Sequence, residues 1–201
     1  DEGSLPDRES KFALFALARE KLMEAGYEPI GMDHFAKPDD ELARARREGR
    51  LRRNFQGYTV IPAPDVIGLG ISSIGDVRGA YVQNEKDLAS YEQRIGAGRL
   101  AVVRGVRRDR DDEIRRDVIH DLMCNFRIDV RRIERDWEIT FTDYFQTDLR
   151  DLAILEQEGL AKIGAKAIEA TPTGELFVRN LAMCFDRYWR EKHAGTDRPV
   201  F

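Results

Sequence analysis

The feature that most constrains the fold is the order of segments over the first 80 residues. A helical pattern, "KFALFALAREKLMEAGY", ends at Gly26 and leads into "YEPIGMDHF", which is typical of a short buried strand. A second helical pattern follows, with Pro38 at its first position and Gly49 at its end. The apolar run "VIGLGISSIG" then predicts another buried strand. This order of helices and strands favours a parallel α/β layer.

Two strands do not complete such a sheet, so we expect residues 1–80 to be the tail of a parallel α/β partial barrel. The opening stretch "DEGSLPDRES" has neither an initiator Met nor a signal peptide pattern, and we expect a fragment of a longer protein. Unpaired strand edges tend to recruit another chain. We therefore also expect residues 1–80 to self-associate, swap strands or be disordered.

From about residue 81 the patterns are mainly helical. Amphipathic helices are predicted in "NEKDLASYEQRIGAG", "RDDEIRRDVIHDLMCNF" and "FTDYFQTDLRDLAILEQEG". Two β-like arms around Gly164 follow, and then one long helix with Thr171 as its N-cap. Helices, a hairpin and a helix in this order are typical of a winged-helix-like module. The expected class is α+β and mainly helical, with residues 1–80 as the barrel remnant and 81–201 as a mostly helical C-terminal domain.

Composition places the chain among globular proteins of a reducing compartment. Hydrophobic residues make up 42% and charged residues 35%, and the net charge of -4 gives no general attraction to nucleic acid or anionic membranes. No apolar run reaches the roughly 18 residues of a membrane span. Cys124 and Cys184 lie far apart in apolar helical stretches, which favours small core residues over a disulfide. We expect a cytoplasmic protein.

The chain has no recognised motif of a complete catalytic site. No phosphate loop, nucleophile elbow or closely spaced set of metal ligands is present, and "GLGISSIG" lacks the spacing of a dinucleotide fingerprint. Its glycines favour close backbone approach at a strand end. Asp33 and His34 end a predicted strand, where the pair can donate a proton or orient a ligand, or can equally tether a loop. His120 and His193 are interpreted as structural or solvent-facing.

Several stretches carry a family resemblance. "YEPIGMDHFAKPDDELARARREGRLRRNFQGYT", "GLGISSIG", "YVQNEKDLASYEQRI", "RDDEIRRDVIHDLMCNFRID" and "NLAMCFDRYW" together look like the C-terminal part of the oxygen-independent coproporphyrinogen III oxidases. These are radical S-adenosylmethionine enzymes of haem biosynthesis. The resemblance extends over nearly all of the chain, and "GMDHFA" with "NFQGYT" is its most specific part.

The resemblance implies a definite activity. The family oxidatively decarboxylates two propionates of coproporphyrinogen III to the vinyl groups of protoporphyrinogen IX. It uses a [4Fe-4S] cluster and a 5′-deoxyadenosyl radical made from S-adenosylmethionine. By motif, Phe55, Gln56 and Ile74 fall where the family lines its S-adenosylmethionine site. Phe55 and Ile74 can pack against adenine or a methyl group, and Gln56 offers a donor and an acceptor, although plain core packing also explains Ile74.

The chain departs from the family by lacking the three-cysteine motif C-x-x-x-C-x-x-C. We therefore expect no cluster in this chain, no activity from it alone, and a full-length enzyme that is monomeric as in the family. The sequence identifies no electron donor or acceptor. The C-terminal module is interpreted as a lid over a four-carboxylate substrate. Arg104, Arg107 and Arg115 can meet propionates, or are simply exposed charge.

Two other functions fit parts of the pattern. A winged-helix module can bind nucleic acid, but the helix in "TFTDYFQTDLRDLAILEQEG" is acidic and the hairpin has only Lys162 and Lys166. We therefore expect no nucleic-acid partner. A relative within the radical enzymes that has lost oxidase activity and handles haem is the other alternative.

Overall fold

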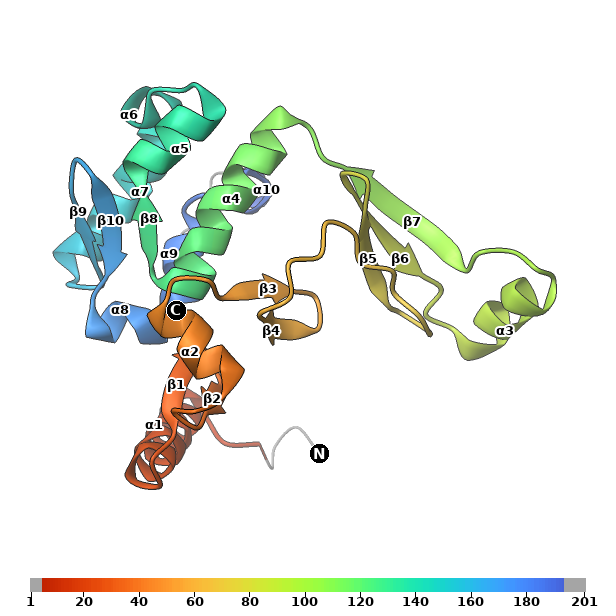
Figure 1. The fold of residues 1–201 in the computed structure, drawn as a ribbon, viewed down its shortest axis with the longest axis horizontal. Coiled ribbons are helices and arrows are strands. Elements are labelled where there is room, and N and C mark those ends of the chain that lie inside the picture. Colours follow the sequence, from red (N-terminus) through yellow and green to blue (C-terminus); the bar gives the residue numbers. More distant parts are fainter. Residues whose placement is uncertain (1–4, 194–201) are drawn as a thin grey trace.

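The computed structural model describes residues 5–193, which form a mixed α+β arrangement without a closed barrel (Figure 1). The α+β class is therefore confirmed. The helices are α1 (Arg8–Glu24), α2 (Glu41–Arg47), α3 (Leu88–Gly96), α4 (Arg110–Asn125), α5 (Val130–Trp137), α6 (Phe141–Tyr144), α7 (Gln146–Gln157), α8 (Pro172–Leu176), α9 (Val178–Met183) and α10 (Arg187–Lys192). The strands are β1 (Glu28–Gly31), β2 (His34–Ala36), β3 (Arg52–Asn54), β4 (Gly57–Thr59), β5 (Ile74–Val77), β6 (Ala80–Asn84), β7 (Val102–Arg107), β8 (Arg127–Asp129), β9 (Ala161–Ile163) and β10 (Ala167–Ala170).

The C-terminal body is built around α4. Asp109 caps this helix by accepting a 2.8 Å hydrogen bond from the Asp112 amide, and the Asp112 carboxylate accepts from the Asp109 amide in return. Its stripe of Ile114, Val118 and Leu122 is fully buried in the main hydrophobic core. The core also receives side chains from α5, α6, α7, α9 and the β8–β10–β9 sheet. The order α4, β8, α5, α6, α7, β9, β10 and α8 places helices before a hairpin and a helix after it, as predicted for a winged-helix-like module.

A second sheet forms an arm that extends from this body. Strands β5, β6 and β7 pair antiparallel in that order, and α3 lies at the far end of the arm (Figure 1). The arm leads directly into α4, because only Arg108 and Asp109 separate β7 from the helix. The short β3–β4 hairpin contacts α4 as well, so hairpin and arm meet at the same helix.

The prediction of a parallel strand at "YEPIGMDHF" is wrong. β1 turns back at Met32 and Asp33 and pairs antiparallel with β2. Met32 adopts the left-handed conformation with φ of 49°, which closes this two-residue reversal. Sequence periodicity identified the buried strand but did not reveal the turn, since neither central residue is a glycine.

The prediction of a strand over "VIGLGI" is also wrong. Only Val66 forms an isolated antiparallel bridge, to Asp76, and the following residues run as a loop in which Ile67 and Leu69 are 76% and 85% exposed. The predicted close approach of its glycines is confirmed: a Cβ on Gly68 would lie 2.8 Å from the Cβ of Ser73. The apolar residues of this run therefore surround a tight loop that packs on the start of β5.

Helix boundaries differ from prediction mainly in the C-terminal third. Thr171 is the N-cap as predicted and accepts from the Gly174 amide at 3.0 Å, but the expected long helix is divided into α8, α9 and α10. The predicted helix over "FTDYFQTDLRDLAILEQEG" is divided into α6 and α7. At the second helix the N-cap is Asp40, so Pro38 precedes the helix and is not its first residue.

One buried carboxylate ties three helices of the body together. Asp148 on α7 is 1% exposed, and its Oδ1 accepts 2.6 Å hydrogen bonds from Arg115 on α4 and from Arg190 on α10. Arg115 also donates to the carbonyl of Phe185 at 3.0 Å. Two cations thus share one anion in a region with little water, where an unpaired charge is costly.

We predict that Asp148→Asn lowers the free energy of unfolding by about 3 kcal/mol, because it removes the buried anion that Arg115 and Arg190 share and leaves only Asp111 and Asp151, nearer the surface, to pair with them. Urea denaturation followed by circular dichroism measures this. The matched control is Asp39→Asn at an exposed turn, which should change stability by less than about 0.5 kcal/mol. Equal stability of the two variants would contradict the argument.

Candidate functional site

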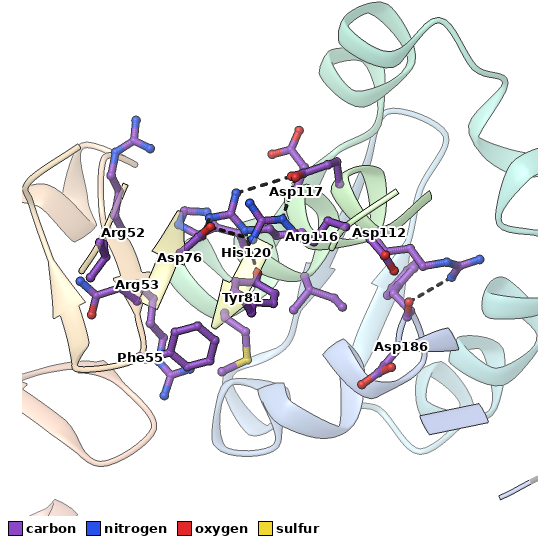
Figure 2. Close-up of a pocket in the computed structure, with 18 of the residues that line it drawn as sticks. Arg52, Arg53, Phe55, Asp76, Tyr81, Asp112, Arg116, Asp117, His120 and Asp186 are labelled. Carbon is purple, nitrogen blue, oxygen red and sulfur yellow. Dashed lines mark hydrogen bonds and ion pairs between the residues drawn. The ribbon is translucent and has the colours of Figure 1, made fainter. Parts of the chain in front are cut away.

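A cavity of about 570 Å³ lies where the β3–β4 hairpin, the β5–β7 sheet and α4 meet. Figure 2 shows Arg52, Arg53 and Phe55 of the hairpin on one side and Asp76, Tyr81, Arg116 and His120 facing them, with Asp112 and Asp186 farther along. The lining therefore combines arginine, aromatic and carboxylate side chains from segments that are distant in sequence.

The hairpin presents Phe55 through a two-residue turn. Asn54 Oδ1 accepts a 2.9 Å hydrogen bond from the Gln56 amide, and Gly57 has φ of 135°, which favours glycine. Phe55 is 51% exposed and its ring stands edge-on to Tyr81, with centroids 5.1 Å apart. An aromatic wall therefore joins the hairpin to the arm.

Register in the arm sets which side chains share the face toward the cavity. Asp76, Tyr81 and Val106 form one cross-strand row, and all three line the cavity. Because side chains alternate along strands, the row two residues away lies on the same face. That second row consists of Ile74, Gln83 and Arg104.

Asp76 holds this face against α4. Its carboxylate, on a residue that is 8% exposed, accepts from Arg108 at 2.7 Å and from Arg116 at 2.8 Å. Arg116 Nε also donates to the Tyr81 hydroxyl at 3.0 Å, and the Arg108 guanidinium lies 4.3 Å from the centre of the Tyr81 ring. Glu113 accepts from Arg108 at 2.6 Å and lies 3.8 Å from Arg116, so two carboxylates balance these two cavity-lining arginines and hold them in place.

His120 and Cys124 lie beside the cavity on α4. Burial, followed by the charges of Arg52 and Arg116, lowers the pKa of His120 below its usual 6.5. Its Nε2 is 3.5 Å from the Cys124 Sγ. Burial raises the pKa of Cys124 to about 12, so this thiol stays protonated and belongs to the core, as the sequence predicted.

The structure places the predicted site residues in different surroundings. Phe55 lines the cavity, Ile74 lies in the adjacent row of the same sheet face, and Gln56 is exposed at the hairpin turn. Asp33 and His34 lie outside the cavity lining. His34 Nδ1 is 2.9 Å from Asp33 Oδ1 and its ring packs edge-on against Tyr58 at 5.0 Å, contacts that fit the tethering alternative.

Among the residues of the site that were missed from the sequence are Asp76, Tyr81, Arg116 and His120, the last of which was interpreted only as structural or solvent-facing. Asp76 and Tyr81 lie two residues from Ile74 and Gln83 in "SSIGDVRGAYVQN", but the strand register is needed to place all four on one face of the sheet. Arg116 is one of many arginines on a helix with alternating charges, and no local pattern marks it.

Comparison with known proteins gives one consistent result. No family model matches the chain. It is 47% identical over 191 residues to the oxygen-independent coproporphyrinogen III oxidase of Escherichia coli, covering 95% of this chain and 42% of that protein. It is 42% identical over 197 residues to the oxidase of the same name from Thermostichus vulcanus, covering 98% and 61%. The solved coproporphyrinogen III oxidase of Escherichia coli, described as a radical SAM enzyme, superposes with a TM-score of 0.89 at 46% identity, over 94% of this chain and 43% of that one.

The chain is a homologue of the C-terminal part of these oxidases. It spans less than half the length of the Escherichia coli relative and about three fifths of the Thermostichus relative. No helix among residues 5–193 has the length and apolar character to cross a membrane.

We predict that His120 titrates below 6.5 and stays neutral at pH 7. A group whose pKa is lowered on folding favours the unfolded state as the pH falls below its unfolded value, because only the unfolded chain then binds the proton readily. The chain should therefore lose stability from about pH 6.5 downward, and His120→Gln should reduce this loss. Proton–carbon NMR of the imidazole groups measures the pKa, and the spectrum of His120→Gln assigns the His120 signal. A His120 titration at or above that of an unfolded peptide would refute the prediction.

Proposed function

We propose that this chain is the C-terminal part of an oxygen-independent coproporphyrinogen III oxidase and forms one wall of its active site in the cytoplasm. The observation that carries the proposal is the 47% identity across 95% of the chain to the Escherichia coli oxidase. The structural support is a sheet face that carries Ile74 next to a cavity walled by Phe55 and Tyr81. The reaction converts two propionates of coproporphyrinogen III to vinyl groups, and each conversion releases carbon dioxide, one proton and two electrons.

The residues on this wall fit part of an S-adenosylmethionine site. Phe55 offers a half-exposed ring for stacking on adenine, and Ile74 offers an apolar surface in the neighbouring row. Gln56 is exposed with its backbone fixed by Asn54, so its amide can donate to and accept from a nucleoside. When bound, S-adenosylmethionine would supply the radical that removes hydrogen from the propionate.

The chain does not fit an iron–sulfur cluster. It has two cysteines, of which Cys124 is buried with a raised pKa, and Cys184 is half-buried against the main core and donates to the carbonyl of Asn180. Residues 5–193 contain no cluster of three side chains that could hold a metal ion. The cluster ligands of the proposed enzyme would have to come from outside these 201 residues, as does the rest of its S-adenosylmethionine site.

The contribution of this chain to the chemistry would be a rigid, water-excluding wall. The Asp76 ion cluster fixes Tyr81, and Tyr81 supports Phe55 from the side. Substrate would enter the cavity beside this wall, where paired arginines and carboxylates leave little freedom to reorganise. The charges of α7, with three acidic residues and one arginine, do not favour the alternative of nucleic-acid binding.

We predict that the 201-residue chain alone does not cleave S-adenosylmethionine after cluster reconstitution, because it lacks the cysteines that bind a cluster. Chromatographic detection of 5′-deoxyadenosine measures this. The coding sequence before Asp1 should encode a C-x-x-x-C-x-x-C motif, and the complete product should be active. Turnover by the 201 residues, or a complete product without oxidase activity, would contradict the proposal; haem binding by an inactive product would favour a haem-handling relative.

We also predict that Phe55→Ala in the full-length protein raises the KM for S-adenosylmethionine about tenfold, through loss of apolar contact. Gln56→Ala should act in the same direction. The control is Ile154→Ala on α7, at an apolar side chain that is 54% exposed and does not line the cavity. Steady-state kinetics with saturating coproporphyrinogen III measures the effect. An unchanged KM in the Phe55 variant would place the ligand elsewhere.

A further inference from the structure

The three arginines that the sequence suggested as candidates for binding propionates have different partners in the structure. Arg115 is committed to Asp111, Asp148 and the carbonyl of Phe185, so its charge is already paired. Arg107 pairs in register with Ala80, and this row lies on the sheet face opposite to Tyr81. Arg104 pairs with Gln83, which pairs with Ile74, so it shares the face of the candidate site.

Arg104 is held in place without being neutralised. Its Nε donates a 2.7 Å hydrogen bond to Gln83 Oε1, and the Gln83 amide nitrogen donates to the carbonyl of Ser72 at 3.0 Å. Because Ser72 accepts from the nitrogen end of this amide, the oxygen end faces Arg104. Within residues 5–193, no carboxylate lies within ion-pair distance of Arg104, and its two terminal nitrogens make no hydrogen bond.

This arrangement differs from that of the other arginines on the same face. Arg108 and Arg116 are both paired with Asp76, which lies one row away and is itself satisfied by them. Arg104 instead keeps the forked pair of donors that matches a carboxylate. A neutral amide fixes its direction in advance, which lowers the entropy lost when an anion binds.

The position of Arg104 defines what kind of ligand it can reach. Neighbouring strands are about 4.8 Å apart, so Arg104 lies about 10 Å across the sheet from Ile74, with Gln83 between them. Val106 and Tyr81 continue the same face into the cavity. A ligand with an apolar or aromatic body against Ile74 and Phe55 can therefore extend a carboxylate toward Arg104.

We propose that Arg104 binds the carboxylate of a ligand that lies across this sheet face, with Gln83 as its positioning residue. The inference rests on the proposed function, which supplies two ligands of this chemistry. One source is the methionine carboxylate of S-adenosylmethionine, and the other is a propionate of the porphyrinogen. Both present a planar anion that the guanidinium fork can bind through two parallel hydrogen bonds.

The test compares Arg104→Gln with Arg107→Gln in the full-length protein. The two substitutions remove the same charge from the same strand, but on opposite faces of the sheet. Losing a charged hydrogen-bonded pair should raise KM about 10- to 100-fold for the ligand whose carboxylate is bound, with kcat little changed. Arg104→Lys should recover part of the loss because it restores charge without the fork.

Separate KM measurements distinguish the two sources. A rise for S-adenosylmethionine alone assigns the methionine carboxylate, and Arg104→Gln should then weaken inhibition by S-adenosylhomocysteine but not by methylthioadenosine, which has no carboxylate. A rise for coproporphyrinogen III alone assigns a propionate.

Both results support the inference, whereas an Arg104→Gln variant that matches Arg107→Gln in both KM values overturns it. An inactive wild-type full-length protein rejects the proposed function and this inference together. If Arg104→Gln alone lowers the thermal unfolding midpoint and raises both KM values equally, the role of Arg104 is structural only and the inference is overturned.

Discussion

The candidate site depends on one nearly buried carboxylate. Asp76 lies on β5 of the arm, and its two oxygens accept separately from Arg108, next to the start of α4, and from Arg116 on that helix. Charge-assisted hydrogen bonds of this kind are strong where water is scarce, and their directions are fixed. Asp76 thereby sets the orientation of the arm on the body, and with it the position of Tyr81 in the opposite strand.

A second set of contacts places the hairpin on the same helix. The Tyr58 hydroxyl on β4 donates to the carbonyl of Met123 at 2.8 Å, and burial raises the pKa of this tyrosine to about 12, so the donor keeps its proton. Gly31 on β1 is required here, because a Cβ would collide with the Tyr58 ring and hydroxyl. The β1–β2 turn, the β3–β4 hairpin and the arm thus converge on α4, and Phe55 meets Tyr81 only because both anchors hold.

These anchors explain how much the sequence could predict. Helix ends follow local chemistry, so Gly26 and Thr171 were placed correctly from their immediate neighbours. The reversal at Met32 was missed because neither residue of its turn is a glycine, and the loop after Val66 was missed because its apolar residues resemble those of a buried strand. Within the site, the family resemblance brought attention to Phe55 and Ile74, whose local sequence alone does not distinguish a pocket wall from a turn and a core position.

The roles of the arginines were beyond sequence reasoning for the same physical reason. Arg115 and Arg116 are adjacent on α4, yet one joins Asp148 of the helical body and the other joins Asp76 of the arm. Arg104 and Arg107 are three residues apart on one strand and face opposite sides. The direction in which each side chain leaves its helix or strand decides which carboxylate it can reach. The sequence alternates positive and negative residues, so it does not show which arginines are paired.

The distribution of exposed apolar side chains follows from the same arrangement. Of the 17 large hydrophobic residues that are exposed within residues 5–193, 15 precede Arg107, on α1, the loops around the hairpin and the arm. From α4 onward the chain instead fills its own core, with Phe141, Phe145 and Phe185 almost completely buried. An apolar surface of this extent is unusual for a protein that functions without a covering partner. In the proposed oxidase that surface would pack against the rest of the enzyme, and the hydrogen bonds of Asp76 to Arg108 and Arg116 would hold the arm in a fixed position relative to α4.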